Sequence, residues 1–238
     1  MYHTIKKEFA RLITENGLQG EKIVVRATPL SAEQAIGNPE DRDYPLVAGV
    51  ERLMQAEFRG SLGQAFTDMY GDFSGRLSDI AEMDLKNNFR RAIFISSLNA
   101  VMKHLGLITK TLHCKNNQPR ECSDELVRYI EKNYGHPRVA MVGFQPRMIE
   151  ALAKRFELRV TDMDENNIGK EKFGVRIYDP SQTEGHLEWC DIAVVTGSTV
   201  VNNTIDQFMI SKPVIFYGVT ISGVAKLLSL NHFCPFGS

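Results

Sequence analysis

Residues 138–162 read RVAMVGFQPRMIEALAKRFELRVTD. The runs RVAMV and LRVT are short and apolar, as in strands that are buried within a sheet. Between them, Ile149, Leu152 and Phe156 recur with helical spacing, and Pro146 stands where proline is favoured, in the first turn of a helix. The segment therefore predicts a strand, a helix over 146–156 and a second strand, which is the unit that builds a parallel sheet.

The same alternation continues towards the C-terminus. Apolar runs predict further strands at 175–178, 191–196 and 213–217, and helical patterns occupy 203–210 and 221–230. Strands that alternate with helices at this spacing form an α/β domain with a mainly parallel sheet.

The N-terminal half has a different pattern. Ile5, Phe9 and Leu12 fall on one face of a predicted helix, and residues 22–28 predict a strand. Residues 89–105 are apolar nearly all round, so we expect a helix there that is buried between two layers.

Two segments of this half are harder to assign. A loop-rich passage contains Gly37, Pro39 and Pro45, and the pattern leaves the type of the elements at 51–58 and 64–68 open.

A polar segment at 113–121 predicts a linker or an ordered loop, and Ser123 predicts the N-cap of a helix over 124–132. We therefore expect two domains, residues 1–115 and residues 116–238.

The composition excludes several classes of protein. There are 28 Lys and Arg residues against 29 Asp and Glu, and 43% of the residues are hydrophobic. A balanced charge argues against nucleic acid and an anionic membrane surface as partners, since both need a basic excess. No signal-peptide core or membrane span is visible, and four cysteines are too few for a disulfide scaffold. We expect a soluble cytoplasmic protein, and the sequence is compatible with a homo-oligomer.

Small, polar or acidic residues follow the predicted strands. They are Gly143, Phe144 and Gln145 after the first strand, Asp162 and Asp164 after the second, Thr196, Gly197, Ser198 and Thr199 at the fourth, and Thr220 after the fifth. The carboxyl ends of parallel strands meet at one edge of the sheet, where ligands bind. These residues are therefore expected to form one ligand-binding site.

The spacing from Gly143 to Asp162 is that of dinucleotide-binding folds, in which an acid about 20 residues after the glycine turn accepts the ribose hydroxyls. GFQPRM replaces the usual glycine fingerprint, and Pro146 removes a backbone donor. The alternative is that Asp162 caps a turn and Gly143 permits a tight bend. The sequence leaves both interpretations open.

The segment TGST, residues 196–199, ends one strand and precedes a helical pattern. Its hydroxyls, backbone N–H groups and helix N-terminus suit a phosphate or a carboxylate. An ordinary capping loop is the alternative. The lysine of a Walker motif is missing, so NTP hydrolysis by that route is not expected.

Cysteine and histidine side chains are candidate ligands for a soft metal. His113 and Cys114 precede Cys122 by a short polar loop, and thiolates with imidazoles suit zinc, copper or iron. The spacing matches no known zinc motif, and lone cysteines are commonly packing residues. We expect that role for Cys190, which precedes a buried strand. No GxSxG, HExxH or catalytic Cys–His pattern is present.

Several short segments are informative as a set. In the first half they are Pro45-Leu46, 63–68 (GQAFTD), Arg91-Ala92, 98–100 (LNA), 111–114 (TLHC) and Cys122. In the second half they are 142–146 (VGFQP), 162–164 (DMD), 196–199 (TGST), 203–204 (NT), 216–220 (FYGVT) and 233–235 (FCP). Over nearly the whole chain, this set resembles the heavy-metal chelation family of prokaryotic proteins.

The resemblance implies an enolase-N-terminal-like α+β domain followed by a Rossmann-like domain, and a role linked to anaerobic metabolism. It implies a cleft between the domains that holds a transition metal or a small anionic ligand. The implied site residues of the first half are Phe66, Thr67, Asp68 and Asn99 for the ligand and His113, Cys114 and Cys122 for the metal. They would face the strand-end residues of the second half.

Two functions from different classes follow. The first is heavy-metal chelation or the binding of a small anionic ligand between the two domains. The second is a Rossmann-type transferase that uses a nucleotide-containing cofactor such as S-adenosylmethionine, with Asp162 on the ribose. A non-catalytic interaction protein, whose loops are only caps, is a third.

Overall fold

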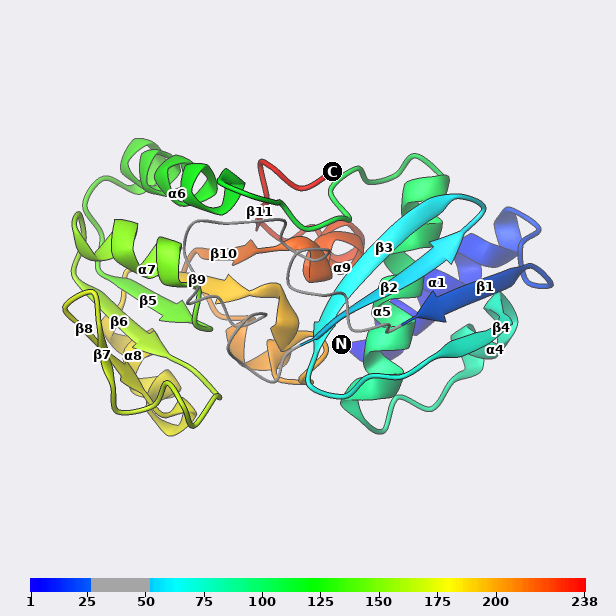
Figure 1. Cartoon of the computed structure of the whole chain (residues 1–238), viewed down its shortest axis with the longest axis horizontal. Coiled ribbons are helices and arrows are strands. Elements are labelled where there is room, and N and C mark those ends of the chain that lie inside the picture. Colours follow the sequence, from blue (N-terminus) through cyan, green and yellow to red (C-terminus); the bar gives the residue numbers. More distant parts are fainter. Residues whose placement is uncertain (27–51) are drawn as a thin grey trace.

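The structure is a computed structural model that describes residues 1–26 and 52–238. Two sheets lie side by side, an antiparallel one in the N-terminal half and a mainly parallel one in the C-terminal half (Figure 1). The predicted α/β class with a mainly parallel sheet is therefore confirmed. The loop-rich passage around Gly37, Pro39 and Pro45 lies outside the described residues.

The N-terminal sheet has the strand order β3-β2-β1-β4, and its neighbours are antiparallel. The strands are β1 (Lys22–Arg26), β2 (Arg52–Phe58), β3 (Ser61–Thr67) and β4 (Phe73–Arg76). The two segments that the sequence left open are thus β2 and β3. They form a hairpin whose turn residues Arg59 and Gly60 both have positive φ, as tight hairpin turns require.

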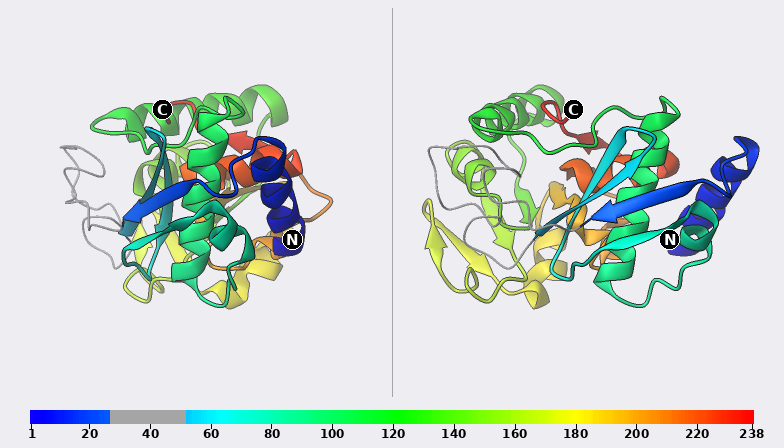
Figure 2. Two further views of the ribbon diagram at one scale, coloured as in Figure 1. Left: turned by 90° about the vertical axis from the view of Figure 1, so that its right-hand side faces the viewer. Right: turned by 45° about the vertical axis from the view of Figure 1, so that its right-hand side comes forward.

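Two helices described in this half match predicted segments, α1 (Tyr2–Glu15) and α5 (Asn88–His104), and the short helix α4 (Leu77–Glu82) was not predicted. Every residue of α5 from Ala92 to Met102 is buried, because the helix lies between the N-terminal sheet and α9 (Ser222–Leu228) (Figure 2). Its apolar character on all sides is thereby explained.

The C-terminal sheet has the order β11-β10-β9-β5-β6-β8-β7, and only β7 pairs antiparallel. The strands are β5 (Val139–Val142), β6 (Leu158–Thr161), β7 (Glu171–Lys172), β8 (Val175–Tyr178), β9 (Ile192–Thr196), β10 (Val214–Tyr217) and β11 (His232–Phe233). Alternate side chains of β5 face opposite layers: Val139 and Met141 pack with α6 (Gln118–Tyr134) and α7 (Pro146–Ala153), and Ala140 packs towards α8 (Thr183–Trp189).

Three sequence predictions are corrected. α6 begins at Gln118, with Pro119 in its first turn, so Ser123 is not an N-cap and its hydroxyl donates to the Arg120 carbonyl. The helix expected at 203–210 is a short 3-10 turn, Ile205–Phe208. The TGST segment leads into another 3-10 turn, Gly197–Thr199, rather than into an α-helix.

Among the described residues, one of the two hydrophobic clusters is shared by both halves. This cluster of buried side chains runs from Phe9 of α1 through Leu98 of α5 to Phe216 of β10. The last residue also returns to the first half, because Thr111 and Leu112 donate backbone hydrogen bonds to the Ser238 carbonyl. The domain boundary near residue 115 and the enolase-like character of the first half stay predictions. Among the described residues, no helix is long and apolar enough to cross a membrane.

Candidate functional site

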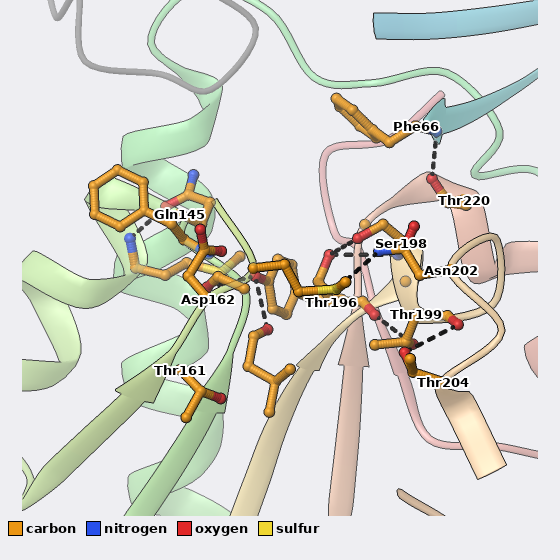
Figure 3. A pocket seen from close by; sticks show the side chains of 18 of the residues that line it. Phe66, Gln145, Thr161, Asp162, Thr196, Ser198, Thr199, Asn202, Thr204 and Thr220 are labelled. Carbon is orange, nitrogen blue, oxygen red and sulfur yellow. Dashed lines mark hydrogen bonds between the residues drawn. The ribbon is translucent and has the colours of Figure 1, made fainter. Parts of the chain in front are cut away.

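A cavity of about 340 Å³ lies at the carboxyl ends of the parallel strands, and β3 of the other sheet borders it (Figure 3). Ligand-binding cavities of proteins have volumes of about 300–1,000 Å³. Asp162 and Gln145 lie on one side of this space, and Thr196, Ser198 and Thr199 lie on the other. The strand-end residues therefore converge on one cavity, as the strand order requires.

Most of the predicted site residues line the cavity. They are Phe66, Asp68, His113, Cys114, Cys122, Gly143, Phe144, Gln145, Asp162, Asp164, Thr196, Gly197, Ser198, Thr199 and Thr220. The backbone N–H of Phe66 donates to the Thr220 hydroxyl at 3.0 Å, which joins β3 to the turn after β10. The wall is thus built from both sheets.

Thr67 and Asn99 do not line the cavity, in contrast to the expectation. The Thr67 hydroxyl bonds the backbone of Met69. Asn99 is fully buried, and its amide group donates to the carbonyls of Gln64, Val219 and Thr220. Its hydrogen bonds give Asn99 a structural role between the two sheets.

Asp162 fits both interpretations of the sequence. Its Oδ2 accepts from the Phe144 N–H at 2.7 Å, and its Oδ1 accepts from the Asp164 N–H and the Asn167 amide, each at 3.0 Å. The carboxylate therefore caps its own turn, and it also lines the cavity. Gly143 has φ of 96°, and a Cβ there would lie 2.7 Å from Thr196 Cγ2. Glycine thus serves both the bend and the close packing of Thr196 against the backbone.

The turn after β9 presents hydroxyl groups. The Thr196 and Ser198 hydroxyls lie 3.1 Å apart, and the Thr199 hydroxyl donates to the Thr196 carbonyl. The N-terminus of α7 is capped by its own side chain, because Gln145 Oε1 accepts from the Met148 N–H at 2.6 Å. An anion in the cavity would therefore meet the β9 turn.

Three thiols line the same cavity: Cys114, Cys122 and Cys234. Burial raises the pKa of Cys114 to about 12, and burial together with the neighbouring Cys114 and Cys234 also raises the pKa of Cys122. Burial also raises the pKa of Cys234. The three groups are consequently neutral thiols at physiological pH. Cys190 is buried elsewhere, with its Sγ 3.4 Å from the Leu187 carbonyl, as a packing residue should be.

His113 is a neutral imidazole in the cavity wall. Its Nδ1 lies 2.6 Å from the Cys114 carbonyl, and its ring meets the Phe66 ring edge-on at 5.4 Å. Nδ1 carries the proton in this contact, which leaves the lone pair on Nε2. Burial lowers the pKa of His113 to about 4.

The low pKa of His113 makes stability depend on pH. Its ordinary value is 6.5, so the unfolded chain binds this proton at higher pH than the folded protein does. The contribution of His113 to the free energy of unfolding is at its maximum above about pH 6.5. It decreases as the pH falls towards 4, by at most about 1.4 kcal/mol per pH unit. His113→Asn keeps a donor for the Cys114 carbonyl and is expected to flatten this slope in urea unfolding. An unchanged slope would contradict the assignment.

The wall also contains residues outside the predicted site, among them Asn167, Tyr217 and Cys234. Cys234 directly follows the two-residue strand β11, which pairs with β10, and a strand this short leaves no periodic signal in the sequence. Asn167 acts through Asp162, and Tyr217 reaches the carbonyl of Gly143 from β10. The Tyr217 contact is set by the tertiary fold, whereas Asn167 and Asp162 belong to the same loop after β6.

Comparisons with known proteins agree with the resemblance predicted from the sequence. Residues 128–229 match the family DUF364, described as "Putative heavy-metal chelation". The chain is similar to a DUF364 protein from Pyrococcus horikoshii, with 18% identity, a TM-score of 0.54, and coverage of 91% of this chain and 78% of that chain. A DUF364 protein from Desulfitobacterium hafniense gives 13% identity, a TM-score of 0.55, and coverage of 94% and 82%.

Both solved structures are described as proteins of unknown function, and at these identities they show the fold alone. No curated protein matches the chain. The family description supports a general role in metal binding.

Proposed function

We propose that the chain binds a soft metal ion, as cargo, together with a small anionic ligand in the cavity between the two sheets. One observation carries this proposal: three thiols and an imidazole share a single cavity with the hydroxyl-rich turn after β9. Thiols and imidazoles are the donors that soft metals prefer, and hydroxyls with backbone N–H groups suit an anion.

The thiols and His113 occupy the β10–β11 end of the cavity. Cys234 follows β11, and its proximity helps to raise the pKa of both Cys114 and Cys122. His113 adds an Nε2 lone pair. The donor types therefore suit a soft metal, and binding would release the thiol protons.

The arrangement favours a metal that arrives with its own chelator. Within residues 1–26 and 52–238, no three His, Cys, Asp or Glu side chains are grouped closely enough to hold a metal ion by themselves. A small ligand that supplies part of the coordination sphere removes this difficulty. Its anionic group would lie at Thr196, Ser198 and Thr199, beside the thiols.

Cadmium is a direct probe of the thiol end. We expect the protein, purified anaerobically, to bind Cd²⁺ that is supplied together with a small carboxylate chelator, with the ultraviolet charge-transfer band of thiolate ligands and with release of protons. The variant Cys114→Ser/Cys122→Ser/Cys234→Ser should lose the band and bind Cd²⁺ at least about tenfold more weakly, because the soft donors are gone. Titration followed by absorbance and elemental analysis measures both.

The matched control is Cys190→Ser, which removes a buried thiol outside the cavity and should retain the band. Equal Cd²⁺ binding by the triple variant and the wild type would exclude the thiol assignment. If the triple variant folds poorly, the same titration of each single Cys→Ser variant shows which thiols bind Cd²⁺.

A further inference from the structure

We infer that the other end of the cavity recognises a ribonucleotide, with its phosphate at the β9 turn, its ribose hydroxyl on Asp162 and its base against the wall near Pro180. This inference rests on the proposed function, because it takes the cavity as the ligand site. It adds the chemical class of the anionic ligand.

The order of the strands sets the length of the cavity wall, and with it the length of ligand that the wall can hold. From β9 the sheet continues through β5 and β6 to β8, and the cavity is lined by residues that follow each of these strands. Neighbouring strands lie about 4.8 Å apart, so the wall from the β9 turn to the residues after β8 spans roughly 14 Å. An elongated ligand with three distinct parts fits this wall.

Gly143 lies in the middle of the wall, directly after β5. A Cβ built there would lie 2.7 Å from Thr196 Cγ2 and 3.0 Å from the Tyr217 hydroxyl. Glycine therefore allows these two side chains to pack against the backbone at this point, and it adds no side chain of its own to the cavity.

Asp162 has one acceptor position left for a hydroxyl. A carboxylate offers about four lone-pair positions. Within the described part of the chain, Oδ1 accepts two hydrogen bonds, from Asp164 and Asn167, whereas Oδ2 accepts one, from Phe144. These three bonds fix the carboxylate in place. Oδ2 can therefore receive a hydroxyl at little entropic cost.

The cavity wall beyond Asp162 includes apolar side chains. Phe144, Met148 and Pro180 line the cavity, and so does Met163, whose side chain is largely exposed. The Met163 sulfur lies 3.7 Å from the Asn202 amide, on the β9 side, so this flexible thioether crosses from one side of the cavity to the other. A planar base could displace it and stack against these groups.

The test uses the whole chain and calorimetry with the four ribonucleoside 5′-monophosphates. We expect at least one of them to bind, and its 2′,3′-dideoxy analogue and ribose 5-phosphate to bind at least tenfold more weakly. Asp162→Asn should weaken the ribonucleotide at least tenfold and leave Cd²⁺ binding unchanged. Asp179→Asn, a matched change in the turn after the next strand, should have no effect because Asp179 does not line the cavity.

The outcomes separate this inference from the proposed function. Cd²⁺ binding without binding of any nucleotide would overturn the inference and leave the proposed function in place. Equal affinity for the dideoxy analogue would overturn the role of Asp162, and this comparison needs no variant. Equal affinity for ribose 5-phosphate would overturn the base site.

Discussion

Gly63→Ala is expected to lower the free energy of unfolding by about 3 kcal/mol or more. Gly63 lies in β3, where the strand crosses α5. A Cβ at this position would lie 2.3 Å from the Ala100 nitrogen and 2.4 Å from the Ser96 oxygen. Both are backbone atoms of α5, so no side chain can rotate away. The helix and the sheet would have to separate, which opens the buried interface.

Urea unfolding measures this loss, and Gly185→Ala is its control. Gly185 lies within α8, and a Cβ there would meet no atom within 4 Å. Alanine should therefore stabilise α8 by up to about 1 kcal/mol through its higher helix propensity. A loss of less than about 1 kcal/mol in Gly63→Ala would show that β3 and α5 can adjust.

Elements with a complete local pattern were predicted from the sequence. The strands at 158–161 and 175–178 match β6 and β8, and Ile5, Phe9 and Leu12 of α1 are buried as expected. Local patterns failed where neighbours decide the structure. β2 and β3 are defined by their pairing with each other. α6 starts in a polar segment because Pro119 is compatible with a first helical turn.

The candidate site was predictable to the extent that it follows from strand order. Parallel strands place Gly143, Asp162 and Thr196 at one edge of the sheet, whatever the conformations of their side chains. The role of Asn99 depends on contacts between distant segments, which no spacing in the sequence reveals. The same holds for Cys234, which lies far along the chain from Cys114 and shares its cavity.

Asn99→Leu is expected to cost about 4 kcal/mol or more of unfolding free energy. In the wild type, the Asn99 amide donates to the carbonyls of Gln64 and Val219, at 3.0 and 3.2 Å, and Asn99 Oδ1 accepts from the Gly223 N–H at 2.8 Å. Leucine would leave these buried backbone groups without partners, and each unsatisfied group costs about 1–3 kcal/mol.

Ser97→Ala provides the control on the same helix. Ser97 is also fully buried, but its hydroxyl has no hydrogen-bond partner among the described residues. Its replacement should be neutral or stabilising, since a buried hydroxyl without a partner is removed. Equal losses in the two variants would mean that burial alone, and not the hydrogen bonds of Asn99, accounts for the effect.

The position of Asn99 also links stability to the cavity. It holds β3, through Gln64, against the turn at Val219 and Thr220, and Thr220 accepts the hydrogen bond from Phe66 that closes the cavity wall. Asn99→Asp keeps an acceptor for Gly223 and loses the donors to the carbonyls. It should therefore weaken Cd²⁺ binding in a protein that still folds, although residue 99 lies outside the cavity. Retention of wild-type Cd²⁺ affinity in a destabilised Asn99→Asp protein would show that the thiol end of the cavity keeps its shape without the hydrogen bonds that the Asn99 amide donates.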